Sequence, residues 1–122
     1  MKRSLKISIW GKEFILPVEY DCYEGEKITE TQKGSVNALL SHPEWIDKSK
    51  KSIVAYCKDR VMRDNKKDIF SYLDPKYLFV KRDEQDPSIA LMLDFSSDPE
   101  HGVAIVYKLN GDIKIGSQDI IL

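Results

Sequence analysis

The sequence contains few of the residues from which disulfide frameworks and metal sites are built. Of its 122 residues, two are cysteine and two are histidine. Neither Cys22 nor Cys57 stands in a Cys-x-x-Cys motif, and no second histidine lies near His101 in the sequence. Two cysteines are too few for a disulfide framework. We therefore interpret both cysteines as reduced thiols and predict no metal site.

Long hydrophobic runs are also missing. No stretch approaches the roughly 20 apolar residues of a membrane span. The N-terminus has basic residues and then alternates at Leu5, Ile7 and Ile9, unlike the continuous apolar run of a signal peptide. We therefore expect a cytoplasmic protein that does not bind membranes.

Motifs of the common enzyme and nucleic-acid-binding classes are absent from the sequence as well. It has no glycine-rich phosphate loop, no Gly-x-Ser-x-Gly motif and no interleaved basic and aromatic residues typical of single-strand binding. The sequence therefore predicts neither an enzyme nor a nucleic-acid partner, and it predicts no cofactor.

The composition indicates one domain over residues 1–122, since 42% of the residues are apolar and 32% are charged. The formal net charge of −1 is unevenly distributed. Residues 28–68 carry nine basic and six acidic side chains (+3), whereas residues 69–122 carry five basic and nine acidic ones (−4). An acidic C-terminal half suits a basic partner.

The N-terminal residues predict a β-hairpin. Residues 5–9 alternate as a strand, and Gly11-Lys12 offers a two-residue turn. A second strand follows, and Pro17 places it at a sheet edge or beside a bulge because proline has no amide to donate. The inner face of this strand comprises Phe14, Leu16, Val18 and Tyr20.

Two helices are predicted next. Thr29-Glu-Thr-Gln32 has the spacing of a capping box and starts a helix that reaches about residue 40. Pro43 suits the first position of a longer helix that ends near residues 62–64, and His42 between them suits a linker or cap. The expected apolar stripes are Val36, Leu39 and Leu40 in the first helix, and Ile46, Ile53, Cys57 and Val61 in the second.

The C-terminal part predicts an antiparallel meander. Apolar residues alternate over residues 88–95, which indicates a strand with one face in the core. Asn110-Gly111 favours a type I′ hairpin turn, and residues 120–122 are expected to pack back on the body. The fold class is therefore α+β, with a mainly antiparallel sheet, formed by the N-terminal hairpin and this meander, packed against two helices.

An acidic turn joins the strands around residues 88–95 and 103–107. Pro99 and Gly102 suit turn positions, and Asp98, Glu100 and His101 accompany them. These three side chains offer carboxylates and an imidazole to a divalent metal or a hydrolase-like reaction. The alternative is a capped turn whose histidine is satisfied within it.

A Cys/His nucleophile pair is a second enzymatic hypothesis, in which Cys22 or Cys57 would meet His42 or His101. Cys57 lies on the apolar stripe of the second helix, where a small buried residue is expected. Cys22 is expected to lack the helix N-terminus or basic neighbour that activates a thiol. We therefore predict no catalytic residue.

Several segments together resemble a family of small uncharacterised bacterial α+β domains, some of which resemble immunity proteins of contact-dependent inhibition and polymorphic toxin systems. The resemblance covers nearly the whole chain and implies a cytoplasmic protein that binds and neutralises a cognate toxin domain. It is carried by Trp10-Gly-Lys-Glu-Phe14, Glu26-Lys-Ile-Thr-Glu-Thr-Gln32, Pro75-Lys-Tyr-Leu-Phe-Val80, Asp98-Pro-Glu-His-Gly-Val-Ala-Ile105 and Ile115-Gly-Ser-Gln-Asp119.

The leading hypothesis is thus an immunity protein whose acidic half meets a basic toxin domain, because opposite charges steer association. A small metal-binding or hydrolase-like domain is the alternative. The candidate partner-binding residues lie in the loops on either side of residues 88–95, and they are Asp83, Glu84, Asp86, Asp98, Glu100 and His101.

Overall fold

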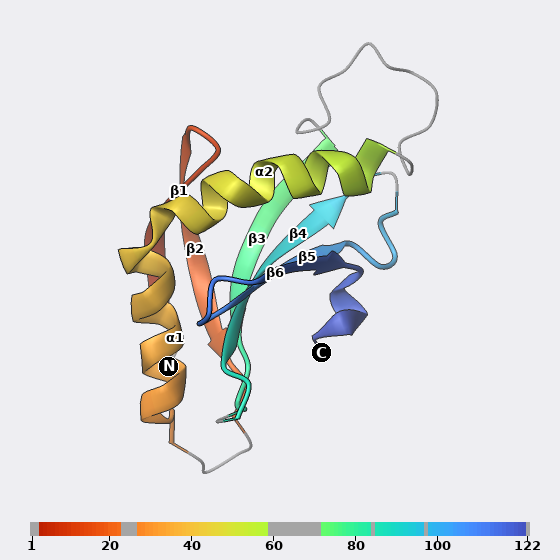
Figure 1. Ribbon diagram of the computed structural model, residues 1–122. Coiled ribbons are helices and arrows are strands. Elements are labelled where there is room, and N and C mark those ends of the chain that lie inside the picture. Colours follow the sequence, from red (N-terminus) through yellow and green to blue (C-terminus); the bar gives the residue numbers. More distant parts are fainter. Residues whose placement is uncertain (1–2, 23–26, 59–71, 84, 97, 122) are drawn as a thin grey trace.

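The computed structural model describes residues 3–22, 27–58, 72–83, 85–96 and 98–121 (Figure 1). The described residues form a six-stranded sheet whose strands lie side by side in chain order, with two helices against one face. The elements are β1 (Arg3–Ile9), β2 (Lys12–Tyr20), α1 (Glu30–Ser41), α2 (Pro43–Lys58), β3 (Leu73–Val80), β4 (Ser88–Phe95), β5 (Val103–Lys108), β6 (Ile113–Gly116) and the 3₁₀ helix η2 (Gln118–Ile120). The predicted α+β class is confirmed.

The N-terminal hairpin and the C-terminal meander belong to the same sheet because β2 and β3 pair in parallel. This ladder joins Val18, Glu19 and Tyr20 to Leu78, Phe79 and Val80, whereas the other neighbouring strands are antiparallel. Parallel strands need a crossover connection, which the α1 and α2 segment supplies. Of the two placements predicted for Pro17, the sheet edge is wrong, since β2 lies between β1 and β3. The parallel ladder begins one residue after Pro17, and β3 has a register shift between Pro75 and Tyr77 beside it.

The β1–β2 turn lies one residue earlier than predicted. Ile9 pairs with Lys12, so the turn residues are Trp10 and Gly11, with φ of +49° and +86°. Positive φ at both central positions is typical of a type I′ turn, but it is unusual for a bulky side chain. The indole Nε1 of Trp10 donates a hydrogen bond to the carbonyl of Ile46 in α2 at 3.1 Å. This contact fastens the hairpin to the helix layer.

The helix-facing core confirms most of the predicted stripes. Val36 and Leu39 of α1 are buried, and so are the three described members of the α2 stripe, Ile46, Ile53 and Cys57. Leu40 is 45% exposed, so its prediction is wrong. Val61 and the predicted end of the second helix lie outside the described residues.

A buried glutamine ties α1 to the parallel strands. The backbone amide of Gln32 donates to the Thr29 hydroxyl, and the backbone amide of Thr29 donates to the side-chain Oε1 of Gln32, both at 3.0 Å. This reciprocal pair confirms the predicted capping box. The Nε2 of Gln32 also donates to the carbonyls of Asp21 at 3.0 Å and Val80 at 3.2 Å. The fully buried Gln32 therefore holds together the helix start and the ends of β2 and β3.

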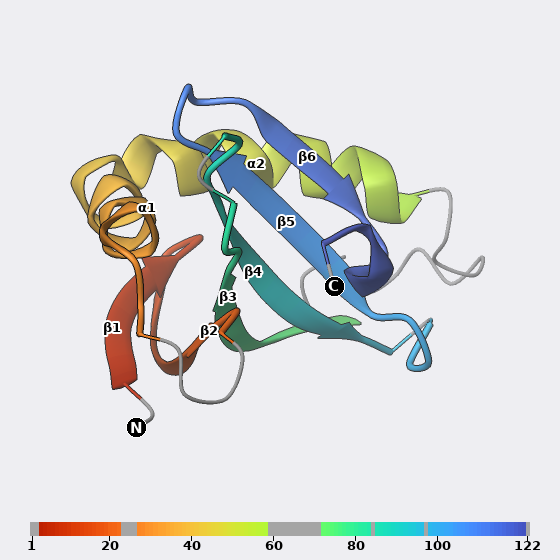
Figure 2. The ribbon, with the colours of Figure 1, turned by 90° about the horizontal axis from the view of Figure 1, so that it is seen from below.

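A second, smaller core lies on the other face of the sheet. It was not predicted, because β4 was expected to bury only one face. Here η2 turns back across β4 and β5 on the side opposite α2 (Figure 2). Ile121 is buried there as expected, Ile120 is 40% exposed, and Leu122 lies outside the described residues. The residues of this core are Ala90, Met92, Ala104, Val106 and Ile121.

The β5–β6 hairpin occurs where predicted, but its turn is not of type I′. Gly111 has φ of +94°, whereas Asn110 is not in the positive region. The amide of Gly111 donates to Lys108 at 2.9 Å, and the amide of Lys108 donates to Asp112 at 2.9 Å. These bonds define a three-residue loop that ends in a glycine bulge, so one extra residue separates the strands.

Replacing Gln32 by alanine is expected to destabilise the protein by about 2 kcal/mol or more, because buried carbonyls would lose their donor. A thermal or urea unfolding curve measures this change. Asn37→Ala, on the exposed side of the same helix, is the matched control and should change stability by less than about 0.5 kcal/mol. Equal losses in the two variants would contradict the role of Gln32.

Gly34→Ala is expected to stabilise the protein by about 0.5–1 kcal/mol. A Cβ added at Gly34 meets no atom within 4 Å, and alanine restricts the unfolded chain more than glycine does. The same unfolding measurement applies. A lower midpoint for Gly34→Ala would show that the helix needs the glycine for a reason other than space.

Candidate functional site

The acidic turn between β4 and β5 is a closed, hydrogen-bonded structure. The Asp98 amide donates to the Phe95 carbonyl and the Gly102 amide donates to the Asp98 carbonyl, both at 3.0 Å. The Nδ1 of His101 lies 3.0 Å from the Oδ1 of Asp98. The predicted turn with a satisfied histidine is therefore present, and the Glu100 side chain projects from its exposed side.

Gly102 occupies a position that only glycine fits. Its φ is +62°, as the sequence predicted. A Cβ there would lie 2.8 Å from the Leu93 carbonyl oxygen and 2.5 Å from the Nε2 of Gln118. Both the backbone conformation and the close packing therefore exclude a side chain.

Gln118 fastens η2 to this turn. Its backbone amide donates to the His101 carbonyl at 3.2 Å, and its Nε2 donates to the Leu93 carbonyl in β4 at 3.0 Å. These bonds bring Asp119 close enough to His101 for its charge to act on the imidazole. We define the acidic loop as Asp98, Glu100, His101 and Asp119.

The electrostatics of the acidic loop favour a protonated histidine. The hydrogen bond to Asp98 raises the pKa of His101, and the negative charges of Asp98, Glu100 and Asp119 raise it further. Half of the imidazole side chain is exposed, at 51%. Positive charge on His101 therefore offsets part of the acidic charge around it below the raised pKa.

The other predicted partner-binding residues do not lie near the acidic loop. The Oδ1 of Asp83 accepts from the amides of Gln85 at 3.0 Å and Asp86 at 3.1 Å. Asp86 forms a 2.8 Å ion pair with Lys108, and Glu84 lies outside the described residues. This turn joins the start of β4, whereas the acidic loop follows its end (Figure 2), and an eight-residue strand spans roughly 24 Å.

His42 lies at the junction of α1 and α2, and Cys57 lies in the core. His42 is the C-cap of α1, its ring stacks on Trp45 at 4.6 Å, and its Nδ1 lies 2.9 Å from the Oε1 of Glu44. Cys57 is buried in α2. The structure therefore places His42 in the predicted cap role and Cys57 in the predicted core role.

One expectation about Cys22 is wrong. Its Sγ lies 3.6 Å from the Oε1 of Gln32 in the first turn of α1, and the Nη1 of Arg82 donates to the same sulfur at 3.4 Å. Cys22 therefore has the basic neighbour that it was expected to lack, while its contact with α1 is to a side-chain oxygen and not to a backbone amide. Arg82 follows β3, 60 residues along the chain, and only the parallel ladder brings it there.

A small polar pocket lies beside η2, at the end of the sheet away from the acidic loop. Its volume is about 100 Å³. Among the described residues no group of three or more histidine, cysteine or acidic side chains is arranged to hold a metal ion. The lining residues are Lys81, Asp83, Asp86, Ser88, Val106, Lys108, Lys114, Ile120 and Ile121.

Fold and site together define a small α+β domain with a charged, structurally fixed loop at one end of its sheet. The chain belongs to the family described as Domain of unknown function (DUF6985), which matches residues 1–122. No curated protein and no solved structure matches it. The expected membership of a small uncharacterised domain family is confirmed. No helix in the described part of the chain is long and apolar enough to cross a membrane.

Gly102→Ala is expected to destabilise the domain by about 1 kcal/mol or more, because alanine at positive φ is strained and would meet Leu93 and Gln118. His101→Ala should cost less, since the ring is half exposed. Thermal unfolding of both variants and the wild type checks this order. Equal midpoints for wild type and Gly102→Ala would contradict the turn geometry.

Asp98→Asn should lower the pKa of His101 toward its ordinary value of 6.5, because the largest cause of the raised pKa is the bond to Asp98. An NMR titration of the His101 ring protons measures this shift. The same pair stabilises the wild type below pH 6.5, and the stabilisation is lost as pH rises through the raised pKa. An unchanged titration in Asp98→Asn would show that Asp98 does not hold the ring in solution.

Proposed function

We propose that this protein is a protein-binding module, an immunity protein that binds and neutralises a basic toxin domain through its acidic loop. The observation that best supports this proposal is that hydrogen bonds from Gly102 and Gln118 hold this loop in place while its carboxylates face solvent. Glu100 and Asp119 are exposed, and neither forms an ion pair within the described part of the chain. Asp98 is 44% exposed beside His101.

A fixed acidic surface supports binding for two physical reasons. Ordering a flexible loop costs free energy at association, and a loop already held by hydrogen bonds avoids most of that cost. Exposed carboxylates also attract a basic surface before contact, which raises the association rate and disfavours acidic partners. An inhibitor requires only this complementarity of shape and charge, and no chemistry of its own.

The second turn contributes less to this proposal. Asp83 is engaged in capping its own turn and Asp86 is paired with Lys108, whose pKa is raised by that hydrogen bond. Charges that are already satisfied attract a partner less than open ones do. We therefore assign the primary contact to the acidic loop and a secondary one, at most, to Asp83 and Asp86.

A hydrolase-like domain is the second candidate, and one observation favours it. The Nδ1 of His101 lies 3.0 Å from a carboxylate oxygen of Asp98, and the imidazole is half exposed. A carboxylate that orients an imidazole in this way is the arrangement of many general bases. This candidate would be favoured if the protein hydrolyses a substrate even when it is saturated with the toxin domain, and if His101→Ala abolishes that hydrolysis.

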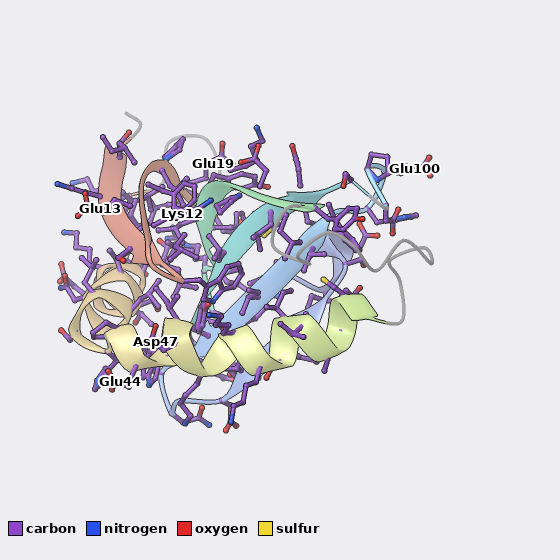
Figure 3. The ribbon with its side chains drawn as sticks, turned by 90° about the horizontal axis from the view of Figure 1, so that it is seen from above. Lys12, Glu13, Glu19, Glu44, Asp47 and Glu100 are labelled. Carbon is purple, nitrogen blue, oxygen red and sulfur yellow. The ribbon has the colours of Figure 1, made fainter. Side chains whose placement is uncertain are left out.

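Charge reversal tests the proposed function. The purified chain is combined with the domain that the adjacent upstream reading frame encodes, which is the candidate toxin under this proposal, and binding is measured at low and high salt. Glu100→Lys and Asp119→Lys should each slow association by about tenfold at low salt, with a smaller effect at high salt. Asp47→Lys, in α2 and far from Glu100 (Figure 3), is the matched control and should bind as wild type does.

Two outcomes would contradict the proposal. If the wild type does not bind the toxin domain, the immunity function is wrong. If both loop variants associate at the wild-type rate while Asp47→Lys associates slowly, the contact surface is on α2, in the basic segment of residues 28–68, and not on the acidic loop.

A further inference from the structure

The described residues cover only part of the sheet face opposite the helices. Over β4 and β5 it carries the second core beneath Ile121. Over β2 and β3 it carries a mixed apolar and charged surface that no pattern in the sequence predicted, with Lys76 paired to carboxylates at its border. We call this surface the outer sheet face, and its residues are Ile15, Pro17, Glu19, Tyr77, Phe79 and Asp94.

Strand pairing makes the outer sheet face continuous. Glu19 pairs directly with Phe79 across the parallel ladder. Pro17 and Tyr77 each precede the pair Val18 and Leu78 by one residue, so they lie side by side on the outer face. Residues two apart along one strand share a face, which adds Ile15 to this surface next to Pro17.

Large apolar groups are accessible on this face. Ile15 is 73% exposed, the largest exposure among the large hydrophobic residues of the described chain. Tyr77 and Phe79 are partly buried because one side of each packs on the second core. A single exposed isoleucine needs no explanation, but one that adjoins a proline on a face that also carries two aromatic rings belongs to a patch of the kind that partners cover.

Two carboxylates border the aromatic rings. Burial raises the pKa of the Tyr77 hydroxyl, and the negative charges of Glu19 and Asp94 raise it further, so both lie near the ring. Lys76 bonds Asp74 at 2.9 Å and forms a longer ion pair of 3.9 Å with Asp94, so Asp94 is the less closely paired of these two carboxylates. Among the described side chains none forms an ion pair with Glu19.

We propose that the outer sheet face docks a segment of a protein partner that presents a lysine or arginine between apolar side chains. The cation would lie over the ring of Tyr77, where the ring face and the negative charges of Glu19 and Asp94 attract it. The apolar neighbours would cover Ile15 and Phe79.

This inference rests on the proposed function, since the same partner reaches both surfaces. Asp94 precedes Phe95, whose carbonyl accepts the bond that starts the acidic loop. The outer sheet face and the acidic loop are therefore neighbours along one side of the molecule. Charge complementarity favours a basic occupant over both, because the carboxylates of the two surfaces outnumber Lys76 and His101, the basic side chains that pair with them.

The test uses the full chain and the toxin domain of the adjacent reading frame, with dissociation constants measured by calorimetry at physiological salt. Ile15→Lys and Glu19→Lys should each raise the dissociation constant by about tenfold or more. Leu40→Lys, at a 45% exposed apolar site on α1, and Asp47→Lys are the matched controls and should stay within about twofold. Unchanged melting temperatures show that every variant is folded. If Ile15→Lys melts at a lower temperature than the wild type, Ile15→Ser takes its place in the binding measurement.

The outcomes separate this inference from the function on which it rests. If Ile15→Lys and Glu19→Lys bind with wild-type affinity while Glu100→Lys binds more weakly, docking at the outer sheet face is contradicted and the immunity function is not. Failure of the wild type to bind would overturn both. A dimer of the protein alone that Ile15→Lys dissociates would identify a second copy as the occupant and overturn the proposed partner.

Discussion

The fold depends on a short parallel ladder between β2 and β3 and on the buried amide that closes it. The ladder joins three residues of each strand, which is little pairing to hold the N-terminal hairpin to the C-terminal meander. Gln32 adds two hydrogen bonds at the ends of these strands and takes its own orientation from the Thr29 capping box. The capping box at the start of α1 thus orients the side chain that stabilises a contact between strands far apart in the sequence.

This constraint determines which surfaces are left for a partner. The helices α1 and α2 pack on one face of the sheet, and among the described residues η2 and Ile121 cover the part of the other face over β4 and β5. Gln118 then fixes the turn after β4 through bonds to Leu93 and His101. This arrangement leaves the acidic loop and the outer sheet face exposed. Hydrogen bonds hold the acidic loop in place, and strand pairing holds the outer sheet face.

Local patterns in the sequence predicted the elements well. The capping spacing identified the start of α1, strict alternation identified β4 with its observed bounds Ser88–Phe95, and Gly102 was recognised from its turn context. Each of these signals depends on residues within one element or one turn. The side chains of the acidic turn were likewise predicted as a group because they are neighbours in sequence.

What the sequence could not supply were contacts between distant residues. The parallel pairing, the second core beneath Ile121 and the approach of Arg82 to Cys22 all join segments far apart along the chain. Trp10 accepts a positive φ where its indole bonds to α2, a tertiary contact that overrides the local preference for glycine. Asp119 enters the acidic loop only because η2 folds back, and no spacing rule connects residue 119 to residue 101.

Amide hydrogen exchange on the complex with the toxin domain tests the central claim most directly, because it maps the contact surface without a mutation. The account predicts slower exchange on binding at residues 98–102, at residues 118–121 and along the solvent-facing part of β2, with exchange in α2 unchanged. Protection confined to α2, with the acidic loop exchanging as in the free protein, would contradict it.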